Sequence, residues 1–279
     1  MCILFMYNGT NVEDSDYSLI VATNRDECYD RPSQNMHRWH EDPSVIGGRD
    51  LEPNSGNGTW LAICPARHKL GVLLNLPTLK VPNPKSRGNL VSEYVTSDKQ
   101  TKDYIDEIKS YTNQCNGFLL VSAELGAGTS TVYTYTNTTD ELASYSDVHL
   151  AFGNSLPDTP LRKVETGKVK MKDICDGLNK VNKENDLIDK LIQLLKSEER
   201  NLPDPQLEKR QPKVFQELSS NFVCVPKTRY GTRTHTIILI TKTGHITVLE
   251  LTMRSPINLD NVQWDRTEFH FDINVDSKL

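Results

Sequence analysis

The residue best suited to chemistry is a cysteine at position 2, in the opening segment "MCILFMYN". A thiol attacks as its thiolate, and a neighbouring cation lowers the pKa of a cysteine. If Met1 is removed, the α-amine lies on the nucleophile residue itself and can act as a local base near neutral pH. The alternative is that Cys2 is a small apolar residue at the start of a buried strand. The segment alone leaves both interpretations open.

Four strongly polar residues, "NRDE" at 24–27, follow the apolar run "SLIVAT". In a functional interpretation, Arg25 lowers the pKa of a nearby thiol, and Asp26 holds an amine or Arg25 in place. In a structural interpretation, the same residues form a solvated turn at the end of a strand. The motif by itself does not separate these two interpretations.

Geometry links the motif to the cysteine. The apolar runs 2–8 and 17–24 are separated by a polar stretch that begins with the turn signal "NGTN", so they predict a β-hairpin. Pairing the two runs places residue 24 or 25 beside residue 2. We therefore expect Cys2 and Arg25 to be neighbours.

Two asparagines and two arginines also stand next to apolar runs. Asn75 closes "GVLLN" and Asn154 closes "LAFGN", where an amide N–H can stabilise an oxyanion or the residue can serve a turn. Arg229 and Arg233 precede the apolar run "TIILI", where an arginine can bind a carboxylate or a phosphate. Arg233 can instead pair with one of the chain's own acids.

The composition excludes several classes of function. The 279 residues carry 32 basic and 37 acidic side chains, a net charge of -5, so we expect no nucleic-acid partner. No apolar run reaches the roughly 18 residues that a transmembrane segment needs. The opening residues carry no basic region, which argues against a signal peptide.

Cysteine and histidine spacing predicts no metal site. The 6 cysteines are widely spread without a CxxC pair, which favours free thiols in the cytosol. His235, His245 and His270 form no zinc pattern. The pair Cys64-Pro65 is of the kind found where a thiolate ligates haem iron, although such pairs are common by chance.

The remaining runs predict an α+β protein. Strands are expected at the two runs above and at 58–65, 69–76, 117–125, 130–137, 148–154, 221–227, 235–241, 245–252 and 267–273. Short turns between consecutive strands, such as "TKTGH" at 241–245, predict mainly antiparallel sheets.

Two regions have helical periodicity. Residues 88–111 predict helices with a break near "TSD", and residues 171–199 predict two helices separated by "NKEND". The polar, Pro-rich segment 200–213 reads as a loop. Without a clean linker or an internal repeat, we expect a single domain over residues 1–279.

Taken together, the motifs resemble the transport and Golgi organisation family, also called the NRDE family. The resemblance runs from residue 1 to about residue 270. It is carried by "MCILF", "ATNRDE", "RPS", "GGRD", "GTWL", "FGNSLPDTPLRK", "LPDP" and "YGTRTHTIIL", in that order.

The family is similar to the N-terminal nucleophile hydrolases. The resemblance implies a four-layer αββα sandwich of two mainly antiparallel sheets. Matched to the cysteine enzymes that cleave bile-acid amides and penicillin V, it implies a catalytic site whose nucleophile is Cys2. The other implied site residues are Arg25, Asp26 (a looser match in spacing), Asn75, Asn154 and Arg233.

The roles known for the family imply haem trafficking rather than amide cleavage. On this resemblance we expect a cytosolic haem chaperone that mobilises haem from mitochondria or storage organelles, with haem as cargo and no required cofactor. Association with mitochondria or the Golgi, organelle membranes as haem donors, and a part in lipid homeostasis are implied in the same way. The alternatives are a cysteine hydrolase of amides or thioesters and an acyl-CoA or lipid binder without turnover.

Overall fold

The computed structural model describes residues 1–53, 56–77, 81–126 and 128–273. The chain forms two compact units, one made of Met1–Asp30 with Asp147–His270 and the other of Arg31–Ser146 with Phe271–Leu279. In the described residues each unit is built on one seven-stranded sheet, and every strand pair whose register is known is antiparallel.

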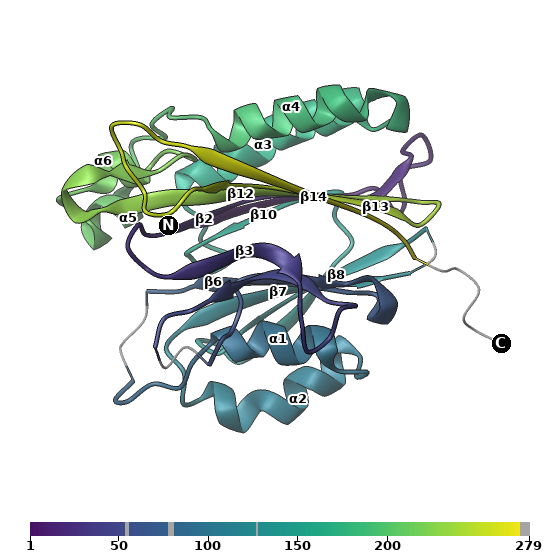
Figure 1. The fold of residues 1–279 in the computed structure, drawn as a ribbon, viewed down its shortest axis with the longest axis horizontal. Helices are drawn as coiled ribbons and strands as arrows, with labels where there is room; N and C mark the ends of the chain where they lie inside the picture. The colour runs from purple at the N-terminus through teal and green to yellow at the C-terminus, as the bar shows by residue number, and fades with distance from the viewer. Residues whose placement is uncertain (54–55, 78–80, 127, 274–279) are drawn as a thin grey trace. The chain divides into compact units, whose positions relative to one another are not determined.

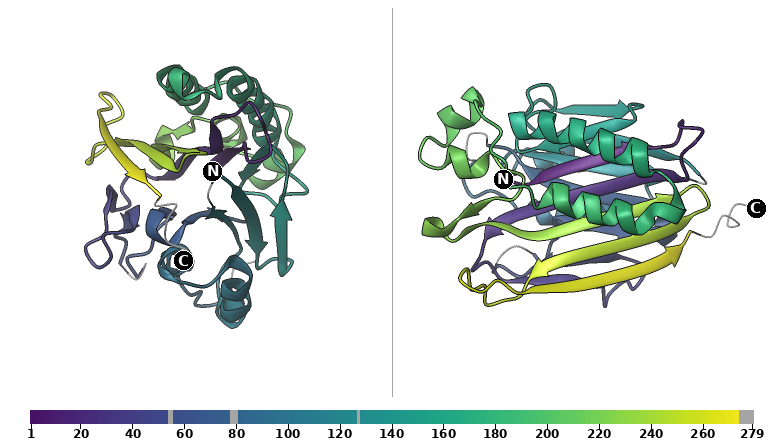
Figure 2. Two further views of the ribbon diagram at one scale, coloured as in Figure 1. Left: turned by 90° about the vertical axis from the view of Figure 1, so that its right-hand side faces the viewer. Right: turned by 90° about the horizontal axis from the view of Figure 1, so that it is seen from above.

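The sheet of the first unit has the order β10-β1-β2-β12-β13-β14, with β11 beside β12. Its strands are β1 (Ile3–Asn8), β2 (Tyr17–Cys28), β10 (His149–Gly153), β11 (Cys224–Val225), β12 (Tyr230–Thr241), β13 (His245–Met253) and β14 (Trp264–Asp272). The helices are α3 (Arg162–Leu178), α4 (Glu184–Leu195), α5 (Pro205–Arg210) and α6 (Phe215–Leu218). Helices α3 and α4 lie side by side over one face of this sheet (Figures 1 and 2).

The sheet of the second unit follows chain order from β3 to β9. Its strands are β3 (Ser33–Arg38), β4 (Ile46–Asp50), β5 (Leu61–Cys64), β6 (Lys69–Asn75), β7 (Phe118–Leu125), β8 (Ser130–Thr136) and β9 (Glu141–Tyr145). Helices α1 (Gly88–Thr96) and α2 (Thr101–Thr112) cover one face of it (Figure 1).

Each unit has its own apolar core between sheet and helices. In the first unit, Phe5 and Ile20 of the sheet pack with Met171 of α3 and Leu191 of α4. In the second, Leu120 of β7 packs in a cluster with Leu90 of α1 and Ile105 of α2. Alternate residues of a strand supply such contacts, as Ile3, Phe5 and Tyr7 of β1 do, because adjacent side chains of a strand point to opposite faces of a sheet.

The predicted N-terminal hairpin is confirmed, since β1 and β2 pair with Ile3 opposite Asn24. The break between α1 and α2 is confirmed, and "TKTGH" forms the tight turn between β12 and β13. The α+β class with two antiparallel sheets is likewise confirmed. The four-layer stacking, the relation to N-terminal nucleophile hydrolases and the single domain over 1–279 stay predictions.

Several element boundaries differ from the sequence expectation. Strand β2 continues through "NRDE" to Cys28, so this motif belongs to a strand and not to a turn after it. The predicted strand over 221–227 shrinks to β11 and is followed by a 3-10 turn over Pro226–Thr228. Strands β3, β4 and β9 have no counterpart in the predicted set.

Helix α3 begins nine residues before the predicted start at 171, at Arg162. Its buried face in this first part includes Lys163 and Gly167, which do not show as apolar periodicity. Gly167 is required by close packing, because a Cβ there would lie 2.2 Å from the ring of Phe5. The helix therefore approaches β1 more closely than a larger residue would allow.

The segment 200–213 is not entirely a loop, because it contains α5. Pro205 fits the first turn of a helix, where no backbone N–H is needed. Asp204 precedes it as the N-cap, and its side chain accepts a hydrogen bond of 2.9 Å from the backbone N–H of Leu207.

Candidate functional site

The thiol of Cys2 lies against the backbone of Asp26, at the edge where β1 meets β2. The N–H of Asp26 donates to Sγ of Cys2 over 3.3 Å, and Sγ lies 3.6 Å from the carbonyl oxygen of Asp26. The cysteine is partly exposed and forms no disulfide. Cys2 is therefore held beside the "NRDE" segment by direct contacts, as the hairpin geometry predicts.

The carboxylate of Asp26 is buried and lies between an amine and a hydroxyl. Its Oδ2 is 3.0 Å from the ammonium group of Met1, and its Oδ1 accepts a hydrogen bond of 2.6 Å from Thr232. The ammonium of Met1 also donates to the hydroxyl of Tyr230. The amine-holding role considered for Asp26 from the sequence thus has its geometric counterpart, with Met1 as the residue that carries the amine.

Two guanidinium groups lie at the same end of the sheet. Arg25 is 7 % exposed and pairs at 4.0 Å with Glu27. Arg233 is 1 % exposed and donates to the backbone carbonyl of Cys28 over 2.9 Å. Both side chains are buried, so their charges act through a poorly solvated environment.

A β-bulge sets the position of Arg233. Thr232 pairs with Asp26 and Thr234 pairs with Arg25, so Arg233 is the extra residue of β12 between them. A bulge of this kind redirects a side chain that regular alternation would place elsewhere. The predicted location of Arg233 before a strand is therefore corrected, since it lies inside β12, which begins at Tyr230.

Burial and charge act in opposite directions on these groups. Burial raises the pKa of the Cys2 thiol, while the N-terminal amine and Arg25 oppose that rise. Burial and the neighbouring Arg25 lower the pKa of Arg233 to about 10. The two arginines thus repel one another, and an anion placed between or beside them would relieve that repulsion.

Asn24 of the motif has a structural role. Its Nδ2 donates over 2.8 Å to the carbonyl oxygens of Leu195 and Asn221, and its Oδ1 lies 2.6 Å from Nδ1 of His235. Burial lowers the pKa of His235 to about 3, and this ring stacks on Trp264 with centroids 4.8 Å apart. Asn24 thereby ties β2 to the end of α4 and to β12.

The two predicted oxyanion asparagines lie in different units. Asn154 directly follows β10, which pairs with β1 so that Ile3 lies opposite Gly153. The backbone carbonyl of Asn154 accepts a hydrogen bond of 2.9 Å from Arg210. Asn75 ends β6 in the second unit and is exposed. The structure places Asn154 next to the Cys2 strand, while the role of Asn75 stays a prediction.

Three residues that sequence reasoning did not select belong to this site: Lys163, Tyr230 and Thr232. Lys163 donates to the backbone carbonyls of Met1 and Ser220 over 2.9 and 3.1 Å. All three lie inside the segments "FGNSLPDTPLRK" and "YGTRTHTIIL" that carry the family resemblance. The family resemblance therefore includes these three positions, but nothing in the sequence distinguishes them from the other residues of the two segments.

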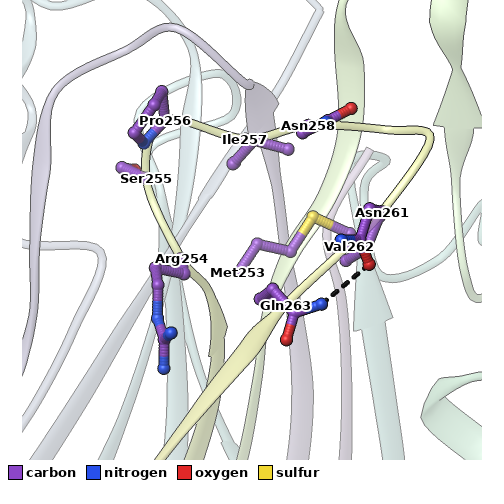
Figure 3. A pocket seen from close by; sticks show the side chains of 9 residues that line it. All are labelled: Met253, Arg254, Ser255, Pro256, Ile257, Asn258, Asn261, Val262 and Gln263. Carbon is purple, nitrogen blue, oxygen red and sulfur yellow. Dashed lines mark hydrogen bonds between the residues drawn. The ribbon is translucent and has the colours of Figure 1, made fainter.

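Other candidate features lie elsewhere. The loop between β13 and β14 encloses an open pocket of about 240 Å³ (Figure 3), where Gln263 donates to Asn261 over 2.8 Å. Its lining runs from Met253 to Gln263 and includes none of the six predicted site residues. Cys64 of the Cys-Pro pair is fully buried, with its thiol 3.4 Å from the guanidinium of Arg67.

Among the residues that the structure describes, no group of three or more His, Cys, Asp or Glu side chains is arranged to hold a metal ion. Within the same residues, none of the helices combines the length and the apolar character required to span a bilayer.

These observations define an α+β protein whose N-terminal strand brings a cysteine, an amine and a buried carboxylate together. The sequence matches the model of the family "Transport and Golgi organisation 2" over residues 1–255, and the chain belongs to this family. The chain is 33 % identical over 277 residues to the "Transport and Golgi organization 2 homolog" of Mus musculus, covering 97 % of this chain and 99 % of the mouse protein.

Two further relatives are similar over their full length. The "Transport and Golgi organization protein 2 homolog" of Homo sapiens is 33 % identical, over 97 % of this chain and 99 % of the human protein. The "Transport and Golgi organization protein 2" of Drosophila melanogaster is 32 % identical, over 98 % of each chain. The family resemblance inferred from the motifs is thereby confirmed.

Proposed function

We propose that this protein is a haem-trafficking chaperone of the cytosol that takes haem from mitochondria or storage organelles and passes it on. Family membership is the starting point, and the site around Cys2 supplies a chemical rationale. Haem has two carboxylates and an iron atom that accepts a thiolate ligand. The relatives' names add transport and Golgi organisation, which we include in the same proposal.

The observation that carries the proposal is a pair of buried guanidinium groups, with Arg25 close enough to act on Cys2 and Arg233 close enough to act on Arg25. Burial strengthens their attraction for carboxylates, because the low dielectric screens charge weakly. A guanidinium also matches a carboxylate in shape, with two parallel hydrogen bonds. Anionic cargo held by two arginines can be released when a competing carboxylate or acceptor is offered, as transfer requires.

Haem transfer tests this proposal directly. Haem-loaded mitochondria are mixed with an apo-haemoprotein, with and without purified protein, and holo-protein formation is followed by absorbance. We expect acceleration by the wild type, a several-fold slower transfer with Arg233→Gln, and no change with Arg229→Gln. Arg229 is the matched control, because its side chain is 43 % exposed and pairs with Asp30. Transfer no faster than in buffer would refute the proposal.

A second candidate function is acyl transfer from an amide or thioester, such as an acyl-CoA or lipid-type substrate, to Cys2. The observation that favours it is the contact of Cys2 and of an α-amine with the same residue, Asp26. After loss of Met1, the amine of Cys2 would act as base and the thiol as nucleophile. An intact-mass measurement of the mature chain tests this candidate, because a retained Met1 excludes the mechanism.

A further inference from the structure

Lys163 is a lysine in an environment that disfavours its charge. It is 1 % exposed, and it is the second residue of α3. Burial lowers the pKa of its ammonium group. The N-terminus of a helix carries a positive partial charge, so a cation in the first turn is disfavoured a second time. Neither helix stability nor solvation explains a lysine at this position.

The side chain reaches the peptide bond in front of Cys2. Its Nζ donates to the carbonyl oxygen of Met1 over 2.9 Å and to that of Ser220 over 3.1 Å. An ammonium group has three N–H donors, and in the described part of the chain these two carbonyls are its hydrogen-bond partners. Its charge also acts on Cys2 and Asp26.

The carbonyl that Lys163 binds thus belongs to the peptide bond that joins Met1 to the cysteine, and the ammonium group is close enough to the thiol to act on its charge. The carbonyl carbon of Met1 is bonded to the nitrogen of Cys2, so four covalent bonds separate it from Sγ. Its oxygen is the atom that Lys163 holds. A donor fixed in this way is the arrangement that stabilises an oxyanion when a nucleophile adds to a carbonyl.

We propose that Lys163 binds the carbonyl oxygen of an acyl group as Cys2 receives that group, which assigns it a substrate-contacting role in the acyl-transfer candidate on which this inference rests. The thiol proton passes to the α-amine of Cys2, and Sγ forms a bond to the carbonyl carbon of a thioester or amide. The carbonyl π electrons move to the oxygen, which accepts an N–H from Lys163.

The second half of the step restores the carbonyl. The electron pair returns as the bond to the leaving sulfur or nitrogen breaks, and the leaving group takes the proton from the amine. Water then hydrolyses the acyl-cysteine thioester, which releases a carboxylic acid and regenerates the thiol. The reaction needs no oxidant or metal ion, and water is its only co-reactant.

The test compares two reactions of the same thiol in the full chain. Acylation of Cys2 by hexanoyl-N-acetylcysteamine passes through an oxyanion, whereas alkylation by iodoacetamide does not. Both rates are measured by intact mass at the same neutral pH and compared as a ratio, because a change in the thiol pKa alters both rates alike. Cys2→Ala identifies the labelled position.

We expect Lys163→Met to lower the ratio of the acylation rate to the alkylation rate by about 10²–10³-fold, the usual loss for one oxyanion donor. Lys163→Arg, which keeps a cationic donor, should recover most of the acylation. Lys168→Met is the matched control, because Lys168 is exposed on the same helix. If Lys163→Met does not fold, the same two rates are compared in Lys163→Gln. Its neutral amide is a weaker donor, so we expect an intermediate loss of acylation.

The outcomes separate the two levels of the proposal. Equal losses of acylation and alkylation in Lys163→Met, or no loss of acylation, would overturn the role of Lys163 alone. A wild-type chain lacking Met1 that is alkylated but never acylated would overturn the acyl-transfer candidate together with this role. Neither result bears on haem transfer, which the mitochondrial assay measures independently.

Discussion

The hydroxyl of Thr232 donates a 2.6 Å hydrogen bond to Oδ1 of Asp26, and the hydroxyl oxygen accepts a 2.9 Å hydrogen bond from the N–H of Val223. Thr232 is thus the shared partner of the buried carboxylate and of a backbone donor. We expect Thr232→Val to destabilise the fold by about 3 kcal/mol, because it leaves both groups without this partner. Urea unfolding measures this change, and Thr232→Ser should stay close to the wild type.

The ion pair between Asp26 and the ammonium of Met1 should matter more than an ion pair in solvent. Asp26→Asn leaves a poorly solvated ammonium without its counter-charge, so we expect a loss of about 3 kcal/mol or more in the free energy of unfolding. Asp30→Asn is the control, because Asp30 pairs with Arg229 in the solvent. Similar unfolding midpoints for the two variants would contradict the burial argument.

The reactivity of Cys2 should increase with pH over a range above that of a simple thiol. Burial raises the pKa of Cys2, so less thiolate is present at neutral pH. We expect iodoacetamide rates, resolved by peptide mass, to rise at a higher pH than those of N-acetylcysteine. Arg25→Gln should move the midpoint further up, because Arg25 favours the thiolate. A midpoint below that of N-acetylcysteine would refute this prediction.

His235 should make the fold sensitive to moderate acid. Its pKa is lowered to about 3 in the folded state, against the ordinary value near 6.5 in the unfolded chain. Between these values the unfolded state binds the extra proton, so this contribution to stability is complete above about pH 6.5 and falls as the pH drops towards 3. The loss should reach a few kcal/mol.

His235→Gln should flatten this part of the stability profile measured by denaturant unfolding from pH 7 to pH 4. His270→Gln provides the comparison, because His270 is exposed on β14. An unchanged slope in His235→Gln would show that other groups carry the acid sensitivity.

Two glycines of α3 should respond oppositely to alanine. Gly167→Ala places a Cβ 2.2 Å from the Phe5 ring and should destabilise by about 1–3 kcal/mol. Gly177→Ala meets no atom within 4 Å and should be neutral or stabilising by up to about 1 kcal/mol, as alanine is the better helix former. Thermal unfolding of both variants would show this contrast, and equal shifts would argue against close packing at Gly167.

The sequence was most informative where local pattern and pairing agree. The apolar runs around the first turn predict the β1–β2 hairpin, and the hairpin alone brings Cys2 to the "NRDE" segment. Lys163 could not be predicted in this way, because lysine is normally exposed and its partner is a backbone carbonyl far along the chain. The helix boundary at Arg162 was missed for the same reason.

The position of Arg233 was also outside the reach of pattern reasoning. Strict alternation along β12 assigns Thr232 and His235 to opposite faces of the sheet. In the structure both contact residues of one face, since Thr232 bonds Asp26 and His235 meets Asn24, two positions apart on β2. The bulge at Arg233 reverses the alternation, and a bulge has no reliable sequence signal.

This bulge gives the spacing of the "YGTRT" segment a meaning that its composition does not have. Deleting Arg233 would leave Thr232 and His235 two positions apart, so regular alternation would place both side chains on one face without a bulge. The bond from Thr232 to Asp26 and the core position of Ile237 would then both be kept, and the side chain lost would be the guanidinium that donates to the carbonyl of Cys28. Arg233 is therefore an extra residue that adds a cation to the site while the residues on either side keep their faces, and a strand grafted here without it would keep the pairing with β2 and lose that cation.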